Sequence, residues 1–490
     1  MNDEKKVFNH LNEIIDFNLD YSSLSNRIDF DKYSSLLKRN KIKKIISNCC
    51  LTFACLLLFT IIAFPFLFIF NFKISTSFKR FNQRYSQSEI ALIENNSFKK
   101  LNNIIYPNTT DIKPVDLEYQ QAIYNFAYSI YKEISSTDNL IFSPLSLYSN
   151  LDIVSLGSQN EDVLREFDQV LGLTRYSREK NYKNMYKSNY YYNDDGTCQM
   201  YNSVFLSNTY DYNSSFIQIL DDYYTEAYQL NFNNQDDVRE MVKWVNQSVQ
   251  DNNFLNINDI NLKDETLVYF FSTLYFKNKW ANKYSSNKNT TDSFYLSNNE
   301  KINNVTYLNH KYFGTVYDYG TYLSVYDYYR NGQKIQYLVP KELDNDIFSL
   351  IDGNNFLVED ETKKVQSKNN RKDIIVDLSL PKFNTSSFID FKSSLSNLGL
   401  SSIFNSNIDS LNKIFNNTDN PVYVDEIIQK NSISFNEEGT ETKTITISVG
   451  ATSAAPFDGD TYKIQLNQPF IYVIRDKNDL PLYIGNVNTI

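Results

Sequence analysis

The chain has 490 residues, and 42% of them are hydrophobic, which is enough apolar material for a large core. The formal net charge of −10 argues against a nucleic-acid ligand, because phosphate binding needs a concentrated positive surface. Three of the four cysteines lie in one apolar segment, which leaves Cys198 alone in the remainder and excludes an internal disulfide framework there.

The first distinctive element is residues 49–70, which contain no charged side chain. At about 1.5 Å per residue, a helix of this length spans about 33 Å, which matches the hydrocarbon core of a bilayer. A buried core helix is the alternative, but such helices usually carry a polar stripe, and this segment has none. The sequence therefore predicts a transmembrane signal anchor over residues 48–72.

Basic residues flank this segment on both sides, with a small excess on the N-terminal side. By the positive-inside tendency, residues 1–47 are a cytoplasmic tail and the C-terminal part is extracytoplasmic. A cleaved signal peptide, which would give a secreted protein, is the competing interpretation. It would require an unusually long charged region before the apolar one.

Residues 73–113 are expected to form a spacer between the membrane and a domain at 114–490. Two triplets in the spacer, beginning at Asn95 and Asn108, match the acceptor pattern for N-glycosylation. Chance matches are also expected in a chain so rich in asparagine.

The domain begins with helical patterns. Apolar residues recur at three-and-four spacing over 123–134, which predicts an amphipathic helix. Ser143 followed by Pro144 is a typical helix start, with a capping side chain and a proline in the first turn. Residues 176–198, rich in tyrosine, asparagine and lysine, are expected to be an irregular surface excursion.

Helical and strand patterns then alternate without a fixed period. Residues 238–249 have a helical pattern, whereas β-branched and aromatic residues dominate 266–276. Strands are also predicted at 432–435, 462–466, 470–475 and 482–487, with a hairpin turn at 476–479. The fold class is therefore α+β.

The segment 436–456 lies between two of these predicted strands and has an alternating pattern. Its small residues are Thr440, Thr442, Thr444, Thr446, Ser448 and Gly450. Its larger residues are Glu441, Lys443, Ile445, Ile447 and Val449. Because side chains of a strand alternate between faces, such a strand could enter a sheet with its small side on a crowded core. Periodicity alone also fits an ordinary edge strand.

The sequence Glu437-Glu438-Gly439-Thr440 resembles the hinge of the reactive loop in the serpin family. Further resemblances follow in the family's order at 139–146, 244–246, 274–280, 380–383, 469–476 and 483–487. Together they cover about residues 115–490. The resemblance implies a serpin fold with three β-sheets, about eight or nine helices and an exposed reactive loop.

The resemblance also implies a function as a suicide-substrate inhibitor of a serine protease. The hinge would comprise Glu437, Glu438, Gly439, Thr440, Thr442 and Thr444. Family spacing implies that the reactive bond is Ser453-Ala454, which suits an elastase-like or subtilisin-like protease. Phe457 is an alternative scissile residue, because the stretch that follows is longer than usual, and it would suit a chymotrypsin-like protease. Insertion of about fourteen residues, at about 3.3 Å each, would carry the bound protease roughly 46 Å.

Three positions outside the loop, and one within it, depart from the family pattern. Ser272 and Thr273 replace an Asn-Ala pair, and Gln429 replaces a histidine ten residues before the hinge glycine. All three belong to the polar cluster beneath the opening sheet, where serine, threonine and glutamine can still hydrogen-bond. Lys443 stands where the family usually has alanine, but its side chain should point outward.

Two other classes of function compete with protease inhibition. A non-inhibitory member of the fold, acting as a surface or binding module, is the main alternative. An enzyme is disfavoured, because His10 lies in the predicted tail and His310 has no nucleophile motif beside it. Cys198 lacks metal-ligand spacing, so no metal or other cofactor is expected. The protein is expected to be a monomer.

Overall fold

The computed structural model describes residues 97–490, except 108–111, 137, 261, 264, 299, 343–350, 352, 368–372 and 442–458. The predicted tail and anchor, residues 1–72, lie outside this range. Among the described residues, no helix is both long enough and apolar enough to cross a membrane. The described part of the chain belongs to a single compact unit, Leu92–Ile490.

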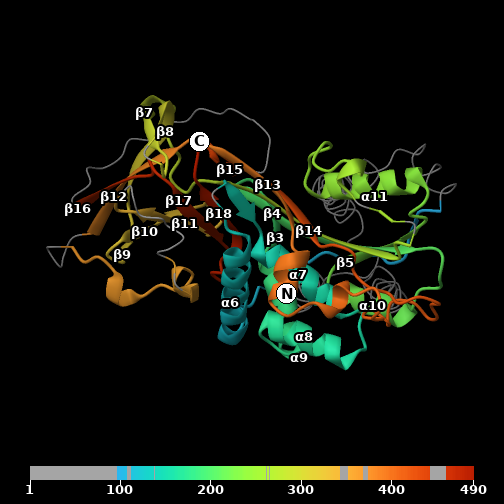
Figure 1. Cartoon of the computed structure of the whole chain (residues 1–490). Coiled ribbons are helices and arrows are strands. Elements are labelled where there is room, and N and C mark those ends of the chain that lie inside the picture. Colours follow the sequence, from blue (N-terminus) through green and yellow to red (C-terminus); the bar gives the residue numbers. More distant parts are fainter. Residues whose placement is uncertain are drawn as a thin grey trace, which may run out of the picture. The chain divides into compact units, whose positions relative to one another are not determined.

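Three sheets form the framework (Figure 1), as the resemblance implied. The largest has the strand order β1-β5-β4-β6-β15-β14-β13, and β3 pairs with β4 beside this path. Its strands are β1 (Lys99–Lys100), β3 (Tyr190–Asn193), β4 (Gly196–Ser207), β5 (Thr225–Leu230), β6 (Val268–Lys279), β13 (Asn384–Asp390), β14 (Ile428–Phe435) and β15 (Gly439–Glu441).

The second sheet has six strands in the order β2-β18-β17-β11-β10-β9, and the third has four in the order β16-β12-β8-β7. The six are β2 (Leu140–Phe142), β9 (Val316–Asp318), β10 (Tyr322–Tyr328), β11 (Lys334–Pro340), β17 (Phe470–Arg475) and β18 (Pro481–Val487). The four are β7 (Thr290–Tyr295), β8 (Lys301–Phe313), β12 (Asp373–Pro381) and β16 (Gly459–Gln465).

Seven α-helices lie within the described ranges, where eight or nine helices were expected for the whole fold. They are α6 (Leu117–Ile134), α7 (Pro144–Ser155), α8 (Glu161–Leu171), α9 (Arg175–Ser188), α10 (Ser214–Asp222), α11 (Gln235–Ser248) and α13 (Lys392–Asn397). Figure 1 shows α11 on one face of the large sheet and α7, α8 and α9 on the opposite face. The large sheet is therefore covered by helices on both faces.

The start of α7 shows why the predicted helices form where they do. Ser143 has extended backbone angles, and its hydroxyl accepts a hydrogen bond from the backbone N–H of Ser146 at 3.2 Å. Pro144 occupies the first helical position, where its missing N–H leaves no bond unmade. The cap predicted from the sequence is confirmed.

The prediction for residues 176–198 was wrong. Most of this stretch forms α9 and the hairpin of β3 and β4, and Tyr182, Met185, Tyr186 and Cys198 are buried in the main core. Tyrosine caused the error, because its ring can fill a core while its hydroxyl bonds to the backbone. The Tyr186 hydroxyl, for example, donates to the Met200 carbonyl at 2.5 Å.

Part of the expected spacer lies against the large sheet. β1 pairs with β5, and the neighbouring Phe98 is buried with its ring 5.1 Å from that of Tyr228. The ammonium of Lys100 lies 2.7 Å from a carboxylate oxygen of Glu226, which is almost fully buried. Residues 97–102 therefore form an arm that closes the outer edge of the sheet.

Candidate functional site

The predicted hinge lies between two central strands of the large sheet. β15 is antiparallel to β14, with Thr440 opposite Phe435, and it is also antiparallel to β6, with Thr440 opposite Asn278. Three residues of the chain thus already occupy the first positions of a strand between β6 and β14.

The turn that leads into β15 is held by backbone and side-chain hydrogen bonds. The side-chain oxygen of Asn436 accepts from the N–H groups of Glu438 and Gly439, at 2.9 and 3.2 Å. The indole N–H of Trp280 donates to the Asn436 carbonyl at 2.9 Å, and the backbone N–H of Trp280 donates to the Glu438 carbonyl at 3.0 Å. The end of β6 therefore fixes the turn directly.

The two glutamates of the turn pair with different lysines. A carboxylate oxygen of Glu437 lies 2.6 Å from the ammonium of Lys382 and accepts from the side-chain amide of Asn289 at 2.8 Å. Burial raises the pKa of Glu437, but its hydrogen bonds together with the positive charge of Lys382 outweigh burial and leave the pKa below its ordinary value. Glu438 forms an ion pair with Lys283.

The next two residues fit only if they are small. A Cβ atom on Gly439 would lie 1.9 Å from the backbone oxygen of Asn278, so any other residue would displace β15 from β6. Thr440 is 1% exposed, and its hydroxyl lies 2.6 Å from that of Tyr329. At this position the small side chain faces the core.

Beyond β15 the sheet has a gap. Within the described part of the chain, no strand pairing joins β6 directly to β14. Between them lies a pocket that is partly open to solvent. Its lining includes residues 271–274 of β6, residues 428–432 of β14, Val245 of α11 and Val249 directly after that helix.

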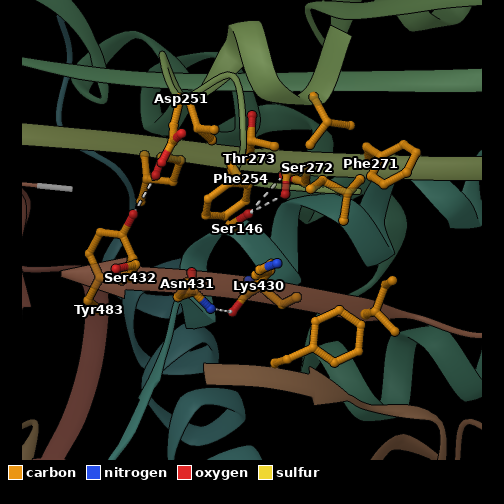
Figure 2. Close-up of a pocket in the computed structure, with 17 residues that line it drawn as sticks. Ser146, Asp251, Phe254, Phe271, Ser272, Thr273, Lys430, Asn431, Ser432 and Tyr483 are labelled. Atoms are coloured by element: carbon orange, nitrogen blue, oxygen red, sulfur yellow. Dashed lines mark hydrogen bonds between the residues drawn. The ribbon is translucent and has the colours of Figure 1, made fainter. Parts of the chain in front are cut away.

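Figure 2 shows the two walls of this cavity, with Ser272 and Thr273 on one strand and Lys430, Asn431 and Ser432 on the other. Tyr483 approaches the cavity from β18 in the second sheet, and its hydroxyl donates to the Leu274 carbonyl. The gap is thus wide enough to admit side chains from a neighbouring layer.

Of the three positions expected in the polar cluster beneath the sheet, Gln429 and Ser272 are hydrogen-bonded at the base of this gap, and Thr273 is not. Gln429 accepts from the Ser143 N–H at 2.7 Å and donates to the Ser143 carbonyl at 3.1 Å, so it is fixed to the start of α7. The Ser272 hydroxyl lies 3.0 Å from that of Ser146 and donates to Asn202 at 2.6 Å. Thr273 faces the other way, 2.8 Å from Ser248 of α11.

The segment between β15 and β16 lies outside the described residues, and with it Thr442, Thr444, Ser453, Ala454 and Phe457. At its far end, β16 pairs in parallel with β12 over seven residues, from Gly459 opposite Asp373 to Gln465 opposite Ser379. The segment therefore runs from the large sheet to the four-stranded sheet and is attached at both ends.

His310 and Cys198, the other candidates from the sequence, lie elsewhere. His310 is buried against Tyr284, with ring centroids 3.9 Å apart, and its Nε2 lies 3.2 Å from Asp327. Cys198 is fully buried, and burial raises the pKa of its thiol well above the usual range. Tyr329, Tyr483 and Trp280 contact the hinge or the gap, and the sequence alone did not mark Tyr329 or Tyr483 as belonging to the site.

A sheet with an open central gap, and with the start of a strand already in that gap, defines a class of proteins that can accept an extra strand. The chain belongs to the serpin family, because the family model Serpin (serine protease inhibitor) matches residues 121–490. Members of this family are in general protease inhibitors rather than enzymes, although some are non-inhibitory.

Individual relatives agree with this assignment. Serine proteinase inhibitor 1 of variola virus is 27% identical over 390 residues, covering 74% of this chain and 97% of that protein. Alpha-1-antiproteinase of Rattus norvegicus is 23% identical over 402 residues, covering 77% and 90%. The native-state structure of the thermophilic serpin tengpin is similar with a TM-score of 0.68 and 21% identity, covering 80% of this chain and all of tengpin.

Proposed function

We propose that this chain inhibits a serine protease by presenting residues 442–458 as a substrate and inserting the cleaved loop between β6 and β14. The observation that carries the proposal is the position of Thr440. It occupies a strand position beside both β6 and β14, and the cavity beyond it continues along the same gap.

The target protease would catalyse the cleavage of the loop with its own active-site residues. The hydroxyl of the protease's serine adds to the carbonyl carbon of Ser453, and the hydroxyl proton passes to the protease's histidine. The bond from Ser453 to the nitrogen of Ala454 then breaks, and the amine leaves with that proton. An ester joins Ser453 to the protease. Insertion before water hydrolyses this ester would move the protease away and distort its active site.

Insertion is favoured by the state of the gap. Insertion would pair the loop with two strands, and its small residues would face the core as Thr440 does. The uncleaved loop cannot reach this state while β16 remains paired with β12. Cleavage releases one end, so the cut itself starts the conversion.

A protease panel tests the proposal. The full-length chain is incubated with elastase, subtilisin and chymotrypsin, and an SDS-resistant complex is expected with at least one of them. Sequencing of the released fragment should give an N-terminus at Ala454, or at Asp458 if Phe457 is the scissile residue. Complete cleavage without a complex would favour the alternative, a non-inhibitory surface or binding module of the same fold.

We also propose that residues 48–72 anchor the protein in a membrane, with the domain outside the cytoplasm. The uncharged apolar stretch at 49–70 supports this proposal. Added protease should digest the domain in intact cells, and alkaline carbonate should leave the chain in the membrane fraction. Release by carbonate would contradict the anchor, whereas a mature N-terminus beyond residue 72 would indicate a cleaved signal peptide.

A further inference from the structure

The gap exposes backbone groups of β6 that have no partner strand. Alternate residues of a strand direct their N–H and C=O groups to the same side. The N–H of Lys279 bonds to Asp195 next to β4, whereas the N–H of Trp280 bonds to Glu438 next to β15. Ser272 and Leu274 lie an even number of residues before Trp280. Their carbonyls therefore point to the same side as the Trp280 N–H, which is into the gap.

Two side chains from the layer beneath the sheet lie within hydrogen-bond distance of these carbonyls. The Tyr483 hydroxyl donates to the Leu274 carbonyl. The Ser146 hydroxyl, which has one proton, lies 3.3 Å from the Ser272 carbonyl and 3.0 Å from the Ser272 hydroxyl. Tyr483 is 1% exposed, and its ring packs edge-on against Phe276 with centroids 6.4 Å apart. The Leu274 carbonyl is thus satisfied by a side chain where an inserted strand would supply a backbone N–H.

We propose that Tyr483 is a positioning residue that holds the gap in its uninserted state by taking the place of the missing strand at Leu274. The inference rests on the proposed loop insertion and identifies one group that opposes it. An unpaired buried carbonyl is costly, so the hydroxyl stabilises the native sheet. Once a strand N–H reaches Leu274, it competes with the hydroxyl for the carbonyl, and this competition weakens the hydroxyl's bond in a buried position. It therefore lowers the free energy of the native state and raises that of the inserted state.

The tyrosine ring and its hydroxyl have separable roles. Tyr483→Phe keeps the ring and its packing, and it removes only the group that bonds to Leu274. Tyr337→Phe is a matched control, because Tyr337 is also fully buried and its hydroxyl has no hydrogen-bond partner among the described residues. Both variants are made in the full-length chain.

The measurement is the rate at which the uncleaved protein converts spontaneously to a heat-resistant form during prolonged incubation. Loss of one buried hydrogen bond from the native state should accelerate conversion by Tyr483→Phe about tenfold. The rate for Tyr337→Phe should equal that of the wild type. Ser146→Ala, which removes the donor to Ser272, should accelerate conversion by a smaller factor and serves if Tyr483→Phe does not fold.

Cleavage of the wild type separates this inference from the proposed function. If the wild type gains heat resistance after the loop is cut, but Tyr483→Phe and Ser146→Ala both convert at the wild-type rate, the role of Tyr483 is wrong and loop insertion stands. If the cut wild type gains no heat resistance, loop insertion itself fails and this inference fails with it. Faster conversion by Tyr483→Phe, with Tyr337→Phe unchanged, supports both.

Discussion

The hydroxyl of Thr440 lies 2.6 Å from the hydroxyl of Tyr329, beneath the point where the hinge enters the large sheet. Thr440 is the first small residue of the alternating segment that lies within the sheet, and it is buried. Its environment shows what the following small residues would meet if they continued along the same gap.

Replacement of Thr440 by arginine should convert the protein from an inhibitor into a substrate. A long charged side chain cannot be buried beside Tyr329 without a large desolvation cost, so insertion would be delayed and the ester would hydrolyse first. We expect the yield of SDS-resistant complex to fall at least about tenfold, while the loop is still cleaved. Thr440→Ser keeps the hydroxyl and should retain the complex. Unchanged complex formation by Thr440→Arg would contradict insertion at this position.

Gln429 should contribute more to stability than the adjacent Lys430. Gln429→Ala leaves the buried N–H and C=O of Ser143 without their side-chain partner, which we expect to cost roughly 1–3 kcal/mol. Lys430→Ala removes a partly exposed ion pair with Asp259 and a contact of the ammonium with the Phe254 ring at 5.9 Å, each worth at most about 1 kcal/mol. Thermal unfolding of the two variants compares these costs. Equal melting temperatures would show that the Gln429 bonds are replaced by water.

The ion pair of Glu437 and Lys382 should make hinge stability depend on pH. The folded-state pKa of Glu437 is lower than its unfolded value near 4.3, so its stabilising effect is present above about pH 4.3. The effect is lost as the pH falls through the lower folded value. We therefore expect Glu437→Gln to lower the melting temperature at neutral pH and to have no effect in strong acid. Lys382→Met should follow the same pH profile, and a pH-independent difference would rule out this origin.

The target preference should follow Ser453 rather than Phe457. A bulky acidic side chain would not fit the small pocket of an elastase-like protease, so Ser453→Glu should slow inhibition of such a protease at least about a hundredfold. Phe457→Ala should leave that rate unchanged. The association rate constant with each protease decides between the two positions, and the reverse result would assign the reactive bond to Phe457.

Two neighbouring lysines in the N-terminal arm should differ in their effects. Lys100→Ala leaves the buried carboxylate of Glu226 without this cation, and we expect it to lower the free energy of unfolding by roughly 1–3 kcal/mol. Lys99 is exposed, so Lys99→Ala should change this energy by less than about 0.5 kcal/mol. Chemical denaturation compares them, and equal losses would mean that Lys100 adds nothing to the other contacts of the arm.

The sequence predicts the fold well where local signals and tertiary structure agree. Ser143 and Pro144 mark the start of α7, and the alternation of 432–435 falls within β14. The family resemblance supplied the order of the remaining elements, and the serpin fold with three sheets is confirmed. The prediction for the tyrosine-rich stretch 176–198 was wrong, because polarity scales do not distinguish the buried Tyr182 and Tyr186 from exposed tyrosines.

Parts of the site could not be predicted from one sequence. Tyr329 and Tyr483 reach the hinge and the gap from the second sheet, and the distance between them and Thr440 or Leu274 depends on how two sheets stack. No local pattern encodes that stacking. The pairing of Gln429 with the Ser143 backbone is of the same kind, because its partners are 286 residues apart in the chain. The roles of Ser453, Ala454 and Phe457 remain predictions.

The parallel ladder between β16 and β12 also has a consequence for how long the intact protein can last. A loop that has not been cut could enter the gap only by unzipping this ladder, in which seven residues pair from Gly459 to Gln465. Because β16 is the edge strand of its sheet, its residue pairs with β12 can break one after another from one end. The lifetime of the active, uninserted form would then depend on β16, a strand more than fifteen residues away from the hinge.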